Sequence, residues 1–172
     1  MIAERLFQSF DEEISGWRFN SSALDKQETA FTGTVLLPRV QDWVRTLGHR
    51  TLSLRADGGS PPGSLSVAGM DFVPDMEFRE YESKLLAIEV KFLRDTDPSG
   101  SLAKSIGQAT LYRALGFKFS YVLIVDCRNQ ALEIWGGSRA RRIILPPEVG
   151  LVVFGKKNGE LAALTTSRSL EK

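Results

Sequence analysis

The residues of this sequence best suited to chemistry are two acids and an amine, Asp75, Glu89 and Lys91. Residues 85–93 form an apolar run that only Glu89 and Lys91 interrupt. Because side chains alternate between the two faces of a strand, this pattern predicts a strand with aliphatic and aromatic bulk on one face. The acid and the amine then point together from the other face. Charges beside an apolar core cost free energy, so this arrangement needs a functional reason.

A hairpin would bring Asp75 to the same face as Glu89 and Lys91. Residues 75–81 also alternate, and an odd-numbered turn centred on Glu82 places Asp75 across from Glu89. Two carboxylates on one face can bind a hard divalent cation such as Mg²⁺, and a nearby lysine can orient a nucleophile or stabilise negative charge. This combination is suited to hydrolysis of a phosphodiester, because a bound metal activates water and neutralises charge on phosphorus.

The same residues carry a resemblance to a known family. Pro74-Asp75, followed by Glu89-Val90-Lys91, resembles the PD-(D/E)xK motif of the restriction-endonuclease-like nuclease superfamily. The resemblance implies an α/β, three-layer fold in which helices flank a mixed central β-sheet. It also implies Mg²⁺-dependent cleavage of DNA, with Mn²⁺ as a substitute metal. Asp75, Glu89 and the main-chain carbonyl of Val90 would be metal ligands, and Lys91 would be catalytic.

A second motif follows on an expected helix. Gln108 and Tyr112 are similar to the Gln-x-x-x-Tyr motif of the RecB-like and Holliday-junction-resolvase-like branches of that superfamily. In those branches the two side chains support the active site or hold the nucleic-acid backbone. Lys104 shares their helical stripe, which suits a phosphate contact. In that superfamily a glutamate on the early helix often completes the metal site; Glu28 is the best-placed candidate here, and Glu12 and Glu13 are weaker ones.

The elements that must position these residues can be read along the chain. Apolar spacing predicts helices over residues 2–15 and 25–47, the second kinked at Pro38. A further helix, capped by Ser99 or Ser101, should reach Leu115 and connect two parallel strands. The strands expected besides 75–81 and 85–93 cover 51–55, 65–67, 119–127, 131–135 and a hairpin of 151–154 with 161–164 around Asn158-Gly159.

Composition bounds the class of protein. The 172 residues, with 42% apolar and 25% charged side chains, fit a single domain over 1–172. The net charge is +1, so no large positive field indicates nucleic acid. One histidine, His49, and one cysteine, Cys127, argue against zinc sites and against Ser-His or Cys-His hydrolases. The single cysteine and the lack of a long apolar run favour a cytoplasmic protein without membrane contact.

Other interpretations fit the same residues. Asp75 after Pro74 also suits a turn, while Glu89 and Lys91 also suit a solvated strand face. The alternative function is a catalytically inactive module that keeps the fold and binds DNA or a protein partner. RNA is a second possible substrate, and the protein could act as a homodimer or as a subunit of a larger nucleic-acid-processing complex. Three arginines, Arg139, Arg141 and Arg142, suit either phosphate contacts or a solvated loop.

Overall fold

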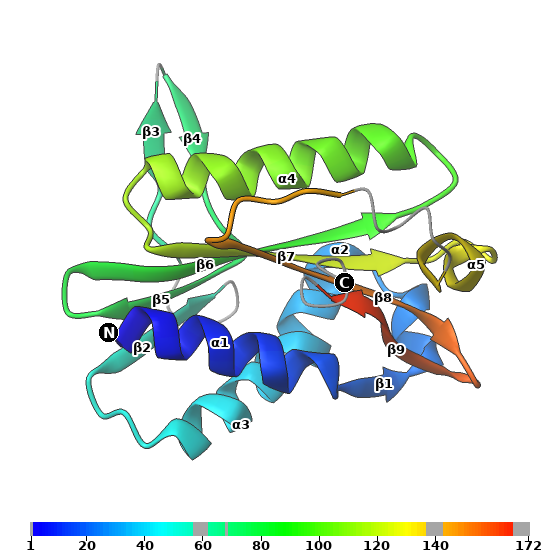
Figure 1. Ribbon diagram of the computed structural model, residues 1–172, viewed down its shortest axis with the longest axis horizontal. Coiled ribbons are helices and arrows are strands. Elements are labelled where there is room, and N and C mark those ends of the chain that lie inside the picture. Colours follow the sequence, from blue (N-terminus) through cyan, green and yellow to red (C-terminus); the bar gives the residue numbers. More distant parts are fainter. Residues whose placement is uncertain (1, 57–61, 68, 137–142, 167–172) are drawn as a thin grey trace.

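A mixed seven-stranded sheet forms the centre of the computed structural model, which describes residues 2–56, 62–67, 69–136 and 143–166 (Figure 1). The strand order is β1-β9-β8-β7-β6-β5-β2. Two short strands, β3 and β4, form a separate antiparallel pair. The strands are β1 Arg18–Asn20, β2 Leu52–Ala56, β3 Leu65–Val67, β4 Met70–Phe72, β5 Met76–Glu80, β6 Ser83–Leu93, β7 Phe119–Asp126, β8 Val149–Lys157 and β9 Glu160–Thr166.

The centre of the sheet is parallel and its margins are antiparallel. Strand β6 pairs with β7 in parallel, and β7 pairs with β8 in parallel. Helix α4 (Pro98–Ala114) connects β6 to β7, so the predicted β-α-β crossover is confirmed. The hairpin of β8 and β9 turns at Asn158-Gly159, where both residues have positive φ, which confirms that prediction as well.

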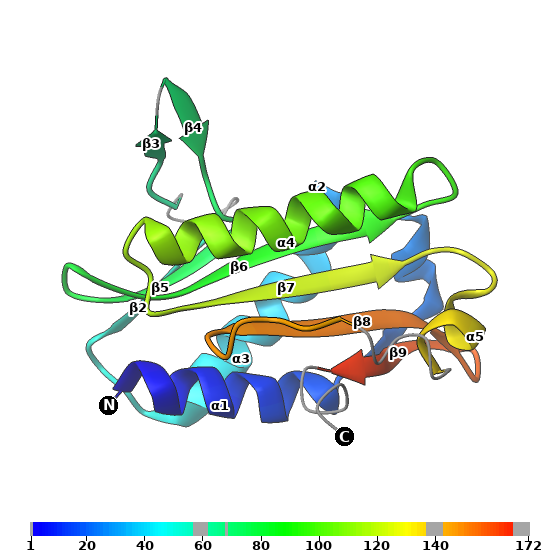
Figure 2. The same cartoon turned by 45° about the horizontal axis from the view of Figure 1, so that its top comes forward.

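Helices cover both faces of the sheet (Figure 2). On one face lie α1 (Ile2–Ser15) and α3 (Leu37–Leu47); on the other lie α4 and the short α5 (Ala131–Gly136). A 3₁₀-helix, η1 (Ser21–Asp25), and one turn of α-helix, α2 (Glu28–Phe31), come before α3. A π-helical turn, η2 (Thr32–Leu36), joins α2 to α3.

The two faces have different cores. Between the sheet and α1 with α3, aromatic rings interlock; the Phe10 ring lies 5.0 Å from Tyr121 and 5.2 Å from Trp43. Beneath α4 and α5 the core is mainly aliphatic, with Val122 and Ile124 of β7 packing near Trp135. Because β7 is buried on both faces, its nearly continuous apolar sequence is explained.

Three sequence predictions about elements are wrong in detail. The expected strand over 131–135 is helix α5, in which Ala131 and Trp135 are buried four residues apart, as in a helix. The cap of α4 is Asp97, whose carboxylate accepts a hydrogen bond from the Gly100 N–H, rather than Ser99 or Ser101. The expected helix over 25–47 is divided at the π-helical turn. Pro38 lies in the first turn of α3, a position that tolerates proline because a first-turn N–H has no partner within the helix.

The predictions for Arg139, Arg141 and Arg142 lie outside the described residues. In the part of the chain that the structure describes, no helix has the length and apolar character needed to span a membrane.

Candidate active site

The site is built on an edge of β6 that continues past the end of its neighbour. Strand β5 begins at Met76, which pairs with Ile88, so residues 89–93 of β6 extend beyond it. Two carboxylates occupy that edge in place of a strand. The Val90 N–H donates to Asp75 Oδ2 at 2.7 Å, and the Phe92 N–H donates to Glu28 Oε2 at 2.9 Å. Backbone donors therefore fix the position of both acids.

Asp75 lies level with Glu89, as the hairpin prediction required. The pairing of Met76 with Ile88 extrapolates to Asp75 opposite Glu89. The turn of the hairpin differs from the expected one. It contains two residues, Tyr81 and Glu82, whereas an odd number was expected. A β-bulge after Phe78 adds one residue to the count and restores the register.

Glu28 and Lys91 form a direct ion pair. Lys91 Nζ lies 2.6 Å from Glu28 Oε1, although the residues are 63 positions apart in the sequence. Both side chains keep some contact with solvent, with 21% of Lys91 and 33% of Glu28 exposed. The site is therefore open to solvent on the side of Lys91 and Glu28 and closed around Glu89, which is only 5% exposed.

Helix α4 covers the site on one face of the sheet. The Tyr112 hydroxyl donates to Glu89 Oε2 at 2.8 Å, and this tyrosine is fully buried. Gln108, one turn earlier, interacts with the Tyr112 hydroxyl through its side chain. Gln108 Oε1 is buried and accepts no hydrogen bond from any described residue. A buried acceptor without a donor is costly, so a bound water or ligand is expected at this position.

The charges of the site perturb one another. Burial, followed by the negative charge of Asp75, raises the pKa of Glu89 from 4.5 to about 7. Burial opposes the charge of Lys91, but the hydrogen bond and charge of Glu28 outweigh it and raise the pKa of Lys91. Burial and the neighbouring Glu89 raise the pKa of Tyr112, so its hydroxyl acts as a donor at neutral pH. The site thus contains more acid than the single lysine can neutralise.

The donor set fits a divalent cation. Within the described ranges, no three His, Cys, Asp or Glu side chains are already grouped as a metal site. Asp75 and Glu89 nevertheless supply carboxylate oxygens, which Mg²⁺ prefers. The carbonyl of Val90 shares a strand edge with its N–H, which is bound to Asp75. Burial, followed by the charge of Asp75, raises the pKa of Glu89, and a bound cation would offset both effects.

The predicted residues are thus brought together with one exception. Lys104 is exposed on α4, and no contact among the described residues joins it to the acids or to Lys91. One cation that the sequence analysis did not single out, Arg94, lies beside Phe92. Its Nη2 donates to the Lys26 carbonyl at 3.1 Å, and its guanidinium lies over the Phe92 ring. Its position two residues after Phe92 in the sequence was the signal available.

The comparisons with known proteins add no family to this geometry: no family model matches the chain, and no curated protein matches it.

Proposed function

We propose that the protein is a nuclease of the restriction-endonuclease-like class that hydrolyses DNA phosphodiester bonds with Mg²⁺ as cofactor. The observation that supports this most is the convergence of Asp75, Glu89 and Lys91 on one stretch of β6. The motif resemblance required this convergence of Asp75, which lies just before β5, with Glu89 and Lys91 of β6.

In this proposal Asp75 and Glu89 hold the cation, and the Val90 carbonyl is a further ligand. Glu28 either joins this set or stays with Lys91. Bound Mg²⁺ supplies Lewis-acid activation and charge neutralisation. Tyr112 holds Glu89 in place through its hydroxyl, while Gln108 offers its buried carbonyl oxygen to a water. Lys91, held by Glu28 at the open side, is placed to stabilise negative charge on the phosphate.

The electrostatics favour a metal-dependent reaction over a metal-free one. Three carboxylates, those of Asp75, Glu89 and Glu28, surround the single amine of Lys91. Without a bound cation, a phosphate that approaches these residues therefore meets net negative charge. Arg94, beside Phe92, would attract the phosphate backbone. The exposed acids Asp25 and Asp95 reduce that attraction. A bound cation is therefore the natural source of the missing positive charge.

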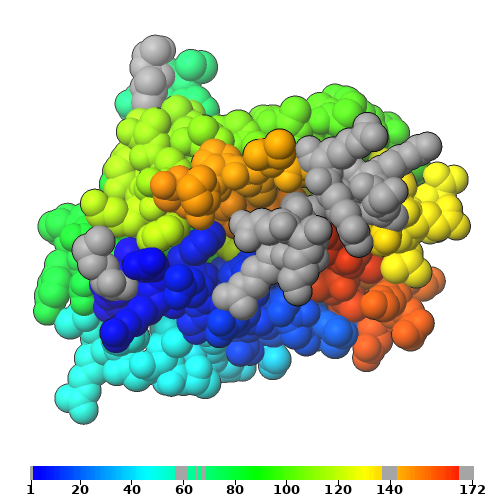
Figure 3. All heavy atoms as spheres, in the orientation of Figure 1, coloured from blue at the N-terminus to red at the C-terminus, as the bar shows by residue number. Residues whose placement is uncertain are grey.

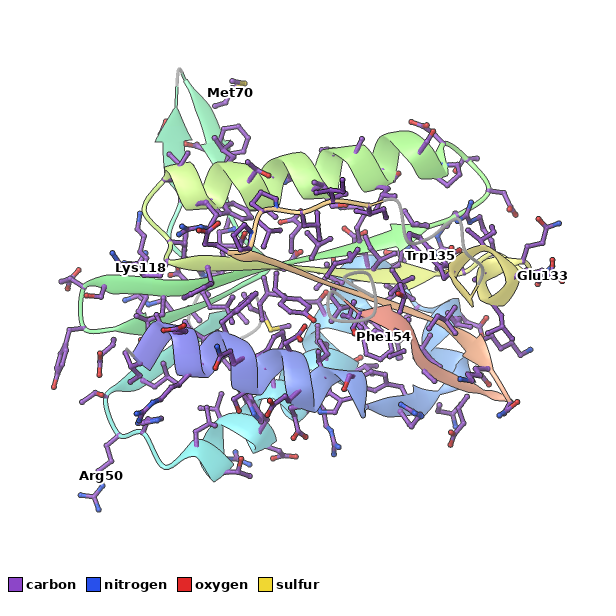
Figure 4. The ribbon with its side chains drawn as sticks, viewed as in Figure 1. Arg50, Met70, Lys118, Glu133, Trp135 and Phe154 are labelled. Atoms are coloured by element: carbon purple, nitrogen blue, oxygen red, sulfur yellow. The ribbon has the colours of Figure 1, made fainter. Side chains whose placement is uncertain are left out.

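The test is a cleavage assay with matched lysine variants. Purified protein with Mg²⁺ or Mn²⁺ is expected to nick or degrade labelled DNA, in a panel that includes RNA. Lys91→Ala should lower the cleavage rate by at least about 100-fold. Lys118→Ala, an exposed lysine at the end of the sheet away from α5 (Figure 4), should cleave normally. Equal rates for the two variants would refute the mechanism.

Calorimetric titration with Mn²⁺ separates the proposal from a non-catalytic module. Binding that is lost in Asp75→Asn supports the nuclease. If the protein binds DNA but Asp75 contributes nothing to metal binding, the protein is a catalytically inactive DNA-binding module, and the nuclease proposal is wrong.

A further inference from the structure

The hairpin of β3 and β4 is the part of the molecule least explained by the site. It is a separate two-stranded sheet that turns at Gly69 and pairs Leu65 with Phe72. In Figures 1 and 2 it stands out from the body beside the C-terminal end of α4, and Figure 3 shows it projecting from the surface. Isolated two-stranded hairpins are marginally stable, so this one depends on how its base is held.

The base of the hairpin is held on two sides, and one of them leads to the candidate site. On one side, the Gly63 N–H donates to Glu77 Oε1 at 3.0 Å. Glu77 is fully buried and also binds Arg79, with Nε at 3.0 Å. On the other side, Phe72 packs against the cluster that contains Tyr112, the tyrosine bound to Glu89. The hairpin and Glu89 are therefore both supported by Tyr112.

The hairpin and the residue directly after it present exposed apolar side chains and no positive charge. Met70 is 57% exposed beside the turn, and Val73, which follows β4, is 46% exposed; Asp71 between them is exposed as well and adds a negative charge. Figure 4 shows the Met70 side chain at the outer end of the hairpin, away from the rest of the molecule. The sequence from Ala56 to Phe78 contains no lysine or arginine. This surface is therefore unsuited to phosphate contacts, and it presents side chains of the kind that contact base faces.

The position of Val73 limits what it can meet. It lies two residues before Asp75, a separation of about 7 Å in extended chain. A nucleic acid whose phosphate is held beside Asp75 must therefore pass close to Val73 with its flanking nucleotides. In an intact duplex those nucleotides present phosphates outward and stack their bases inward, whereas unpaired nucleotides can turn a base toward an apolar surface.

We propose that the β3–β4 hairpin binds unpaired nucleobases next to the cleaved bond, so that the preferred substrate is single-stranded or forked at that point. The inference rests on the proposed nuclease function and specifies its substrate class. Met70 and Val73 contact the base faces, Phe72 packs against the Tyr112 cluster, and Glu77 holds the base of the hairpin through Gly63.

Binding is measured in the Lys91→Ala background with Mg²⁺, by fluorescence anisotropy on duplex, forked and single-stranded DNA. Met70→Ser with Val73→Ser should weaken binding to forked and single-stranded DNA about tenfold and change duplex binding little. The control is Leu132→Ser with Ile144→Ser, exposed apolar residues outside the hairpin, which should bind as the parent does. A 2-aminopurine beside the cleaved bond should be quenched by the parent and less by the hairpin variant.

Several results would overturn the inference. One is equal affinity of the hairpin variant and the control for every DNA. Another is tight binding of the parent to intact duplex alone. A third is a hairpin-dependent dimer, seen by sedimentation, with unchanged DNA binding. Hairpin-dependent binding without any cleavage by the unmutated protein would leave the hairpin inference standing and refute the nuclease proposal. Circular dichroism and the single Met70→Ser variant check that folding is preserved.

Discussion

Replacing Glu89 with glutamine is expected to stabilise the metal-free protein strongly at pH 8 and only slightly at pH 5. The carboxylate is buried beside Asp75, and its pKa is raised from 4.5 to about 7. Between pH 4.5 and about pH 7 the folded protein binds more protons than the unfolded chain. The free energy of unfolding therefore falls as the pH rises through this window. Above pH 7 the full cost of the buried charge is present, and glutamine removes it.

The magnitude follows from the pKa. One pKa unit corresponds to about 1.4 kcal/mol, so the rise from 4.5 to about 7 corresponds to about 3 kcal/mol of lost stability at pH 8. Glutamine has nearly the same shape and can still accept the Tyr112 hydrogen bond through its carbonyl oxygen. For a chain of this length, about 3 kcal/mol raises the melting temperature by about 6 to 12 °C.

The assay is urea denaturation and thermal melting in EDTA at pH 5 and pH 8. The exposed Glu133→Gln serves as the control, and its effect should stay within about 0.5 kcal/mol at both pH values. A Glu89→Gln effect that is destabilising, or the same at pH 5 and pH 8, would refute the reasoning about buried charge. Adding Mn²⁺ at pH 8 should then stabilise the unmutated protein more than the variant, because ligand binding to the folded state adds stability.

Three further changes have defined outcomes. Tyr112→Phe removes the hydrogen bond that lowers the pKa of Glu89, so the pH midpoint of the stability loss should move upward; an unchanged midpoint contradicts this role. Gly150→Ala places a Cβ 2.2 Å from the Tyr121 ring and should cost about 2 to 3 kcal/mol in urea denaturation, whereas full stability would show that the ring can move. Asp126→Asn breaks a buried ion pair on β7 and should cost about 3 kcal/mol. The folded Asp126→Asn protein should still cleave DNA, and loss of cleavage would mean that this carboxylate serves the site.

The sequence predicted the parts of the fold in which local pattern and tertiary packing agree. Met76 and Phe78 face the aromatic core because strict alternation leaves one apolar face on β5. The register that sets Asp75 level with Glu89 was also predicted, although through a turn of the wrong length. The β-bulge after Phe78 shifts the register by one residue and so brings Asp75 level with Glu89 despite the shorter turn. Nothing in the sequence of the strand indicates this bulge.

Other parts depend on contacts between distant segments. Residues 131–135 alternate well enough to resemble a strand, but Trp135 Nε1 donates to the buried Asp126, and that anchor suits a helix. Glu77 was expected on the polar face of β5 and is instead fully buried, because Arg79 and the backbone of Gly63 neutralise and bind it. Sequence spacing cannot show such pairing.

The π-helical turn Thr32–Leu36 has a consequence for how the chain tolerates change in length. Such a turn arises when one extra residue is accommodated inside an α-helix. Deleting one residue within the turn would therefore restore regular α-helical winding while the helices on either side keep their relative rotation, so Glu28 would keep its contacts with the Phe92 N–H and Lys91. Helix α3 has no such extra residue, so deleting one residue from it would rotate the segment that carries Glu28 by about 100° around the helix axis. The Glu28 carboxylate would then leave both partners, without any substitution near Asp75 or Glu89.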